Sequence, residues 1–347
     1  MKIAFIDHWP NFRLENNYFF HLLKGSYDLE INQVDPDLLF LHTDSYRACE
    51  REKFVNHPAK RVFWTMEGEP PRFDSDSYPP YPSITTQGGV GYGDPTSAAT
   101  LATNDSNRTY YYGRCDFALT HEIMDDARHY RLPWWTGFID WFNVGHYGKH
   151  SEPSYLIPEN QIASNEYSNT PKTKFCAHVF SNATERRLTV HKKLSSYKTL
   201  DGLGNYFDNQ ISAGLNDFHG VNTPWEKQKL EFLKDYRFSI CFEHKNRAGY
   251  HSEKLFHAKV AGTVPIYWGN ESVNNDFNKK CFINLIDYKS VDEMVDYIKY
   301  VDQNEDVYQS YVQEPLFVDN IIPDRFRPEA VLQFFKDTVL STGGGGS

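Results

Sequence analysis

Residues 236–269 place the strongest constraint on the fold, because they read in order as a strand, a polar loop, a helix, a turn and a second strand. Residues 238–242 are a short apolar run of strand type, and residues 264–268 resume a strand. Between them, Ser252 is a typical helix N-cap and Gly262 a typical helix end. This order predicts a βαβ unit of a parallel sheet, in which a ligand binds beside the carboxyl end of the first strand.

The polar loop of this unit and the first turn of its helix carry the side chains that an anionic ligand needs. They include Glu243, Arg247, Tyr250, Glu253 and Lys254. Amide groups at a helix N-terminus attract phosphate, basic side chains can neutralise a diphosphate, and carboxylates can accept hydrogen bonds from ribose or sugar hydroxyls. The pattern favours a sugar-nucleotide site. A solvated loop with surface ion pairs is the alternative, which the residues alone leave open.

The same alternation of strand and helix signals runs through most of the 347 residues, which are enough for two domains. It predicts an α/β protein with a first Rossmann-like domain over 1–150, a linker over 151–173 and a second domain over 174–325. We expect a helix over 326–340. Residues 341–347 resemble an engineered Gly-rich linker, so we expect the natural protein to continue beyond this point.

Residues 70–112 interrupt this pattern inside the first domain. They are rich in Pro, Gly, Ser, Thr and Tyr, and a loop of this length is either a functional lid or an irregular insertion. Asp74 and Asp76 within it have the spacing of a metal-binding carboxylate pair. Such pairs are mostly solvated loop residues, so we expect no metal site there.

The composition argues against several classes of protein. The net charge of −10 disfavours a general nucleic-acid binder, which needs a basic face. The five cysteines are scattered, without the spacing of a zinc site or a disulfide framework. We expect a cytoplasmic protein, because no signal peptide precedes the first strand and no apolar stretch reaches membrane-spanning length.

Three segments of the second domain form an ordered signature: Tyr236-Arg-Phe-Ser-Ile-Cys-Phe-Glu, Tyr250-His-Ser-Glu-Lys and Ala261-Gly-Thr-Val-Pro-Ile-Tyr-Trp-Gly. Two outlying segments agree with it in order, namely Phe180-Ser-Asn-Ala with Arg187, and Arg61-Val-Phe-Trp-Thr-Met-Glu-Gly-Glu. Together they resemble the α1,3/α1,4-fucosyltransferases, glycosyltransferase family 10, and especially the bacterial members. The resemblance is dense over 174–300 and thinner over the first domain.

The resemblance implies a GT-B architecture, in which two Rossmann-like domains face each other across a cleft and the C-terminal one binds GDP-β-L-fucose. It implies an inverting transfer of L-fucose to the O3 hydroxyl of an N-acetylglucosamine or glucose unit, without an essential metal or other cofactor. The acceptor would be an N-acetyllactosamine-type or related glycan, giving Lewis X-type products. Peripheral membrane association would belong to the full-length protein. A GT-B transferase for another sugar nucleotide and a non-catalytic glycan-binding protein are the alternatives.

The donor-site roles of the family carry over to positions that match its motifs. Arg187 and Lys254 would neutralise the diphosphate, while Tyr250 and Glu253 would contact the ribose, the phosphates or the fucose. The same segments supply further donor-binding candidates, which are Ser181, Asn182, Glu243 and Arg247.

On the acceptor side, the resemblance makes Glu67 the general base, with Glu69 as the alternative because the spacing before the following proline differs among members. An inverting transfer needs one carboxylate to remove the proton of the acceptor hydroxyl as its oxygen attacks the anomeric carbon. His8 and Trp9 stand at the end of the first predicted strand. They would face the cleft and stack on the acceptor sugar, or else pack at the strand end.

The sequence departs from the family in two places. His244 follows the Phe-Glu pair where the family often has Asn, and residues 70–112 have no counterpart. Because that insertion follows the general-base segment directly, the acceptor and the preference between α1,3 and α1,4 linkage cannot be copied from relatives.

Overall fold

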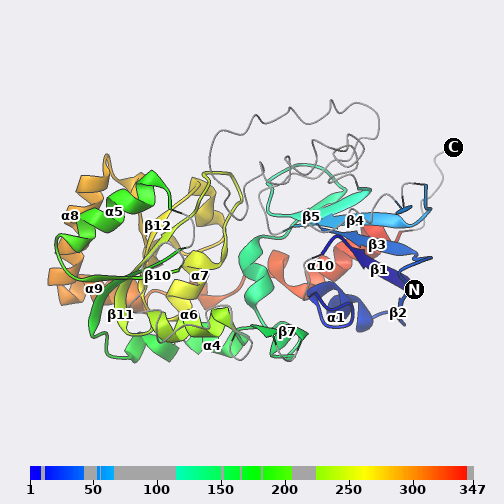
Figure 1. Ribbon diagram of the computed structural model, residues 1–347, viewed down its shortest axis with the longest axis horizontal. Coiled ribbons are helices and arrows are strands. Elements are labelled where there is room, and N and C mark those ends of the chain that lie inside the picture. Colours follow the sequence, from blue (N-terminus) through cyan, green and yellow to red (C-terminus); the bar gives the residue numbers. More distant parts are fainter. Residues whose placement is uncertain are drawn as a thin grey trace. The chain divides into compact units, whose positions relative to one another are not determined.

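The computed structural model describes residues 1–8, 12–42, 53–54, 56–65, 115–149, 152–164, 166–180, 183–204 and 224–341. The chain forms two compact units (Figure 1). The first comprises Met1–Pro133 and Arg325–Ser347, and the second comprises Trp134–Asp324.

Among the described residues of the first unit, six parallel strands form a sheet in the order β2-β1-β3-β4-β5-β6. Their bounds are β1 (Lys2–Ile6), β2 (Glu30–Ile31), β3 (Leu38–Leu41), β4 (Lys60–Trp64), β5 (Phe117–Thr120) and β6 (His129–Arg131). The central strands are nearly continuous apolar runs, as expected for a parallel sheet buried on both faces. Because β1 pairs with β2 on one side and β3 on the other, the strand order reverses between β1 and β3.

The C-terminal segment packs on this first unit. Helix α10 (Pro328–Phe334) continues as one π-helical turn over Phe335–Val339. The buried ring of Phe335 lies 6.2 Å from that of Phe19, which belongs to helix α1 (Tyr18–Lys24), and 6.0 Å from that of Phe40 in β3. The ammonium group of Lys60 donates hydrogen bonds to the carbonyls of Val339 and Ser341 at 2.7 and 3.1 Å. The helix predicted over 326–340 is therefore present, and it completes the core of the first unit.

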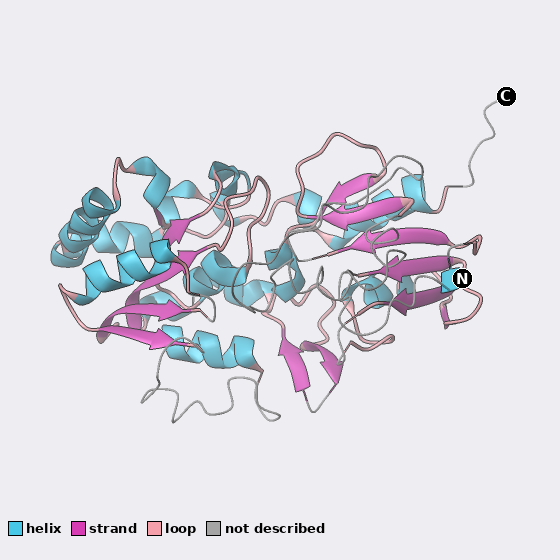
Figure 2. Ribbon diagram, turned by 45° about the horizontal axis from the view of Figure 1, so that its top comes forward, coloured by secondary structure: helices cyan, strands magenta, loops and turns pink. Residues whose placement is uncertain are grey.

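Within the described residues, five parallel strands form the sheet of the second unit, in the order β10-β9-β11-β12-β13. Figure 2 draws the strands as magenta arrows. Their bounds are β9 (Lys174–Val179), β10 (Leu200–Leu203), β11 (Tyr236–Phe242), β12 (Val264–Trp268) and β13 (Ile283–Asn284). The βαβ unit predicted over 236–269 is β11, helix α7 (Glu253–Val260) and β12. The prediction of two parallel-sheet α/β domains is confirmed.

The remaining α-helices of the second unit are α4 (Glu159–Ser164), α5 (Glu185–Ser195), α6 (Trp225–Leu233), α8 (Val291–Gln303) and α9 (Glu305–Gln313). Helix α5 contacts α8, and α6 contacts α7. The crossovers from β9 to β10 and from β11 to β12 run in opposite directions along the sheet. Because such crossovers are right-handed, α5 and α7 cover opposite faces.

The boundary between the units lies at Pro133 and Trp134, earlier than the segment 151–173 that the sequence predicts as a linker. That segment contains the end of an antiparallel hairpin, β7 (His146–Lys149) with β8 (Glu152–Tyr155), and helix α4. The reason for the early boundary is Trp135. Its side chain is fully buried in the second unit, 5.2 Å from the ring of Phe277, and its indole nitrogen donates to Asp276.

Candidate functional site

The strand order of the second sheet reverses between β9 and β11, because β10 lies outside β9 and β12 lies outside β11. In open α/β sheets, ligands bind at such a switch point, beside the carboxyl ends of the two strands. Helix α5 begins beyond β9 with Thr184 as its N-cap, and α7 begins beyond β11 with Ser252 as its N-cap. The two helices therefore present their N-terminal amides at this edge of the sheet, where an anion is stabilised.

Glu243, immediately after β11, ties the end of this strand to the start of α7. Its side chain is 1% exposed, and its Oε1 accepts hydrogen bonds from the amide and the hydroxyl of Ser252, both at 2.8 Å. Its Oε2 lies 3.3 Å from Nζ of Lys254. The carboxylate thus fixes the N-cap of α7 and orients a lysine. Direct contact between Glu243 and a donor stays a prediction.

Lys254 lies in the first turn of α7, where its ammonium group contacts three neighbours. Nζ donates to the Ser252 hydroxyl at 2.9 Å, and it lies 3.3 Å from Glu243 and 4.0 Å from Glu253. Burial lowers the pKa of Lys254, but the two carboxylates raise it more, so the pKa lies above its ordinary value. Lys254 is therefore a fixed cation at neutral pH.

Glu253 is held by a second lysine that the sequence reading missed. Nζ of Lys229, in α6, lies 2.9 Å from Oε1 of Glu253, and their side chains are only 5% and 10% exposed. Burial raises the pKa of Glu253, but Lys229 and Lys254 lower it more, so the pKa lies well below its ordinary range. Glu253 is therefore an ionised acceptor. No local signal distinguishes Lys229 from the exposed lysines of an ordinary amphipathic helix.

Arg187 reaches the same edge from α5. The residue is 3% exposed, and its guanidinium donates to the carbonyl of Phe242, the last residue of β11, at 2.5 Å. Burial lowers the pKa of Arg187, while the nearby Glu243, Glu253 and Tyr250 raise it. The structure thus brings together the two cations that the sequence predicts for the diphosphate, although they are far apart along the chain.

Tyr250 and His244 complete the visible wall of the site. Tyr250 is 1% exposed, and its hydroxyl is hydrogen-bonded to Nδ1 of His244 at 3.3 Å. Burial and the nearby positive charge of Lys254 lower the pKa of His244 to about 4, so this ring is neutral at neutral pH. Arg247 is partly exposed in the same loop, where its carbonyl accepts from the amide of Tyr250 at 3.1 Å.

A buried hydrogen-bond chain supports this loop from behind, and the sequence reading missed it too. Nδ1 of His251 is bonded to a carboxylate oxygen of Asp276 at 2.6 Å, and Nε2 to the hydroxyl of Ser272 at 3.0 Å. The same Ser272 oxygen accepts from the amide of Gly249 at 2.8 Å. Gly249 has φ of +79°, a left-handed conformation that favours glycine. The chain therefore fixes the turn that precedes Tyr250.

In the first unit, His8 follows β1 at the β1/β3 switch point. Its Nε2 accepts a hydrogen bond from the indole of Trp64 at 2.9 Å, and the ring of Phe12 lies 4.0 Å away. The contact of His8 with an acceptor stays a prediction. The other predicted residues and the insertion lie outside the described residues; they are Trp9, Glu67, Glu69, Ser181, Asn182 and 70–112.

Across the described ranges, no group of three or more His, Cys, Asp or Glu side chains is placed to hold a metal ion. No helix within the same ranges is long and apolar enough to cross a membrane.

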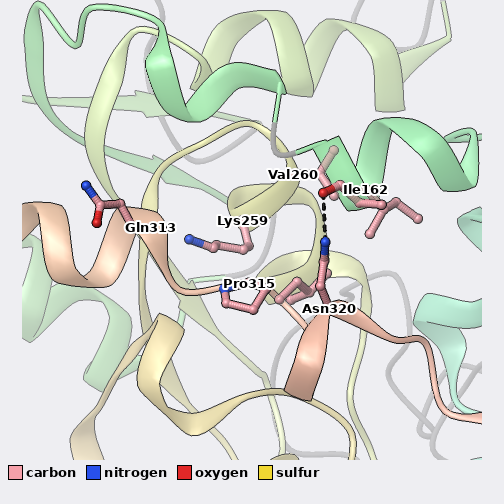
Figure 3. A pocket seen from close by; sticks show the side chains of 8 residues that line it. Ile162, Lys259, Val260, Gln313, Pro315 and Asn320 are labelled. Carbon is pink, nitrogen blue, oxygen red and sulfur yellow. Dashed lines mark hydrogen bonds between the residues drawn. The ribbon is translucent and has the colours of Figure 1, made fainter.

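Figure 3 shows a separate cavity of about 100 Å³ between α4, α7 and the end of α9. None of the residues predicted for the donor site lines it. The buried ammonium group of Lys259 donates to the carbonyls of Tyr311 and Val312 at 2.9 and 2.7 Å. Burial lowers the pKa of Lys259 to about 8. We infer that this lysine stabilises the C-terminal end of α9.

Comparison with known proteins identifies the segment that contains the site. Residues 169–314 match the family model described as glycosyltransferase family 10 (fucosyltransferase), C-terminal. The chain is therefore similar to this family over residues 169–314, the family 10 segment. The residues that gather at the β9/β11 switch point all lie within this family 10 segment, and the resemblance drawn from the sequence motifs is confirmed.

The similar proteins extend beyond that segment. The chain is 28% identical over 320 residues to an α-(1,3)-fucosyltransferase FucT of Helicobacter pylori, covering 90% of this chain and 60% of that protein. It is 35% identical over 88 residues to the 4-galactosyl-N-acetylglucosaminide 3-α-L-fucosyltransferase 9 of Cricetulus griseus, over 25% of this chain and 24% of that protein. The chain thus spans about 60% of the length of its H. pylori relative.

A crystal structure of an α1,3-fucosyltransferase with GDP-fucose matches over 96% of this chain and 89% of that one, with a TM-score of 0.62 and 25% identity. This likeness, with the two Rossmann-like units, confirms the GT-B fold class predicted from the sequence.

Proposed function

We propose that this chain is a fucosyltransferase that takes L-fucose from GDP-β-L-fucose and passes it to a glycan hydroxyl. The observation that carries the proposal is the pairing of Arg187 and Lys254 at the β9/β11 switch point, within the family 10 segment. The complex of a similar fucosyltransferase with GDP-fucose supports the choice of donor.

The two cations suit the bond-breaking step. When the anomeric carbon–oxygen bond breaks, negative charge grows on the departing GDP. Preorganised cations stabilise this growing charge more than they stabilise the ground state, and therefore lower the barrier. Their positions are fixed before the donor binds, since Arg187 is bonded to the Phe242 carbonyl and Lys254 to Glu243 and Ser252.

The acidic side chains at the site have a different role. Glu253 is ionised and accepts from Lys229, so it suits donor hydroxyls rather than phosphate. Tyr250, whose hydroxyl is hydrogen-bonded to His244, supplies a hydroxyl at the same edge of the sheet. Basic side chains outnumber acidic ones at the switch point, and this excess favours a diphosphate. The basic residues are Arg187, Lys229 and Lys254, and the acidic residues are Glu243 and Glu253.

We propose an inverting transfer to O3 of an N-acetylglucosamine or glucose unit, giving α1,3-fucosylated, Lewis X-type products. Glu67 acts as the general base, with Glu69 as the alternative. The acceptor hydroxyl oxygen forms its bond to the anomeric carbon, the carboxylate takes the proton, and GDP leaves with the bonding electrons. The name of the Cricetulus griseus relative includes an N-acetylglucosaminide, which supports this choice of acceptor.

The cytoplasmic location, with association at the inner face of the membrane in a longer protein, is also a proposal. Cys176, Cys241 and Cys281 are buried free thiols. Burial raises the pKa of both Cys241 and Cys281 to about 12, which keeps them unreactive. Such thiols suit a reducing compartment. Fractionation of the source cells with an antibody to the protein tests this location.

Titration calorimetry tests the donor. We expect GDP and GDP-fucose to bind and UDP-sugars not to bind. Lys254→Ala is expected to weaken GDP binding about 10- to 150-fold, the usual worth of hydrogen bonds to a charged group. Lys192→Ala, an exposed change on α5, is the control and is expected to leave the affinity unchanged. Equal GDP affinity in Lys254→Ala and the wild type contradicts the donor-site assignment.

Product analysis tests the reaction. Incubation with GDP-fucose and N-acetyllactosamine, followed by determination of the product linkage by nuclear magnetic resonance, is expected to give an α1,3-linked fucose. GDP-fucose binding without transfer to any of lactosamine, the type 1 isomer, lactose or glucose would favour a glycan-binding protein instead.

A further inference from the structure

A second, open pocket adjoins the switch point, and the donor roles described so far do not use it. Its volume is about 440 Å³, within the range of small-ligand sites. It lies at the carboxyl edge of the second sheet and is lined by Thr184, Glu185, Arg186, His244, Trp268 and Val291. The residues come from the N-terminus of α5, the loop after β11, the end of β12 and the start of α8.

One wall of this pocket is flat and cationic. The guanidinium carbon of Arg186 lies 3.9 Å from the centre of the Trp268 ring, which is the distance of a close stack. Trp268 ends β12, so the strand fixes the indole, and the indole in turn orders the arginine. Planar aromatic ligands stack well on arginine and tryptophan faces. A surface of this kind suits a nucleobase better than a sugar ring.

A carboxylate stands in the same pocket. Glu185 lies in the first turn of α5 and is exposed. Guanine carries two neighbouring donors, N1–H and the 2-amino group, and a carboxylate has two oxygens that can accept from both. Adenine has an acceptor at N1 and no 2-amino group, so it cannot make this pair of hydrogen bonds. Glu185 is therefore suited to distinguish guanine from adenine.

His244 links this pocket to the cations. It lines the pocket and is also hydrogen-bonded to Tyr250. Along α5, Arg186 lines the pocket while the next residue, Arg187, reaches the Phe242 carbonyl. A nucleotide whose phosphates lie at Arg187 and Lys254 can thus extend its base into the pocket.

We propose that this pocket holds the guanine base of the donor, with Glu185 accepting from N1–H and the 2-amino group and the Arg186–Trp268 stack covering one face of the base. The inference rests on the proposed function and deepens it, since it assigns the part of the site that selects a guanine nucleotide.

Inosine diphosphate provides the sharpest probe, because it keeps N1–H and lacks only the 2-amino group. Calorimetry is run with GDP, inosine diphosphate and ADP on the wild type, Glu185→Gln and the control Glu231→Gln. Glu231 is an exposed helical glutamate on α6, outside the pocket, so the control makes the same chemical change. The fold of each variant is checked by its Tm and circular dichroism.

We expect the wild type to bind GDP at least tenfold more tightly than inosine diphosphate, with ADP weaker still. Glu185→Gln is expected to weaken GDP binding about 10- to 150-fold and to bring the ratio of the GDP and inosine diphosphate affinities close to one. Glu231→Gln should keep the wild-type ratio. An unchanged ratio in folded Glu185→Gln overturns the inference while leaving GDP binding, and so the proposed function, in place.

Arg186→Ala provides an independent measurement should Glu185→Gln fail to fold. Loss of the stack is expected to weaken GDP and inosine diphosphate equally, by roughly 5- to 150-fold, and Arg186→Lys should recover only part of this. Unchanged affinity in Arg186→Ala overturns the stacking role. A wild type that binds none of the three nucleotides refutes the proposed function itself. This result differs from an unchanged affinity ratio in Glu185→Gln and from an unchanged affinity in Arg186→Ala.

Discussion

Replacing Lys229 by Met tests how the buried charges of the site are held. Lys229 and Glu253 form a 2.9 Å ion pair, and their side chains are only 5% and 10% exposed. Removal of one partner leaves the other charge buried without its main counter-ion, which typically costs 3–5 kcal/mol. We therefore expect Lys229→Met to lower the free energy of unfolding at pH 7.5 by about 3–5 kcal/mol.

The pKa of Glu253 also predicts how the stability of Lys229→Met changes with pH. In the wild type the pKa of Glu253 is depressed, so the pair contributes stability above the ordinary glutamate pKa, and this is lost only as the pH falls through the depressed value. In Lys229→Met we expect the pKa of Glu253 to rise, because burial still raises it and Lys229 no longer lowers it, although Lys254 remains 4.0 Å away. The variant is then expected to recover stability relative to the wild type between pH 7.5 and pH 5, as Glu253 takes up a proton.

Urea unfolding followed by circular dichroism at pH 5, 6 and 7.5 measures both effects. Lys193→Met is the matched control, since it removes the lysine of an exposed pair with Asp292, whose side chains are 38% and 72% exposed. Such surface pairs contribute at most about 1 kcal/mol. A loss below about 1 kcal/mol in Lys229→Met, or a loss that does not shrink toward pH 5, refutes the description of Glu253 as an ionised group held by Lys229.

Three further changes probe the rest of the site and the fold. Glu67→Gln is expected to lower kcat by about 10²- to 10⁴-fold without weakening GDP binding. If Glu69→Gln lowers kcat and Glu67→Gln does not, the general base is Glu69. If fucose transfer survives each of the two substitutions, neither residue is the general base. His251→Asn should raise the KM for the donor more than it lowers kcat, because the hydrogen bonds behind the Gly249 turn are lost. The same loss should lower the free energy of unfolding by about 1–3 kcal/mol. An unchanged KM would speak against a positioning role for His251. Phe335→Ala should cost about 3–5 kcal/mol of unfolding free energy, measured by urea unfolding, and a cost below about 1 kcal/mol would show that the C-terminal segment adds little to the first core.

The sequence predicted those features that depend on local pattern. Alternating apolar strands and capped helices identified both parallel sheets, because the hydrophobic period and the cap residues act within a few positions. Ser252 was predicted as the N-cap of α7, and the structure confirms it. The prediction that Arg187 and Lys254 bind the same ligand came from the family motifs. Their separation along the chain does not indicate that β9 and β11 are neighbouring strands.

Other features depend on contacts between distant segments. Lys229 looks like any helical lysine until α6 is placed against α7. The buried chain from His251 through Asp276 and Ser272 joins residues more than twenty positions apart, as their separations of 25 and 21 residues show. The boundary at residue 133 follows from the burial of Trp135 in the second unit, whereas a polar, Pro-containing stretch further on had the composition of a linker.

The return of residues 325–341 to the first unit has a consequence for how the chain matures. The second unit, Trp134–Asp324, is continuous and is therefore fully synthesised before the last helix of the first unit. Domains usually fold in order from the N-terminus during synthesis. Here the second unit can finish first, while the first sheet waits for Phe335 to cover Phe19 and Phe40. A nascent chain that had emerged from the ribosome only as far as Arg325 would then have a complete second unit and an unfinished first unit.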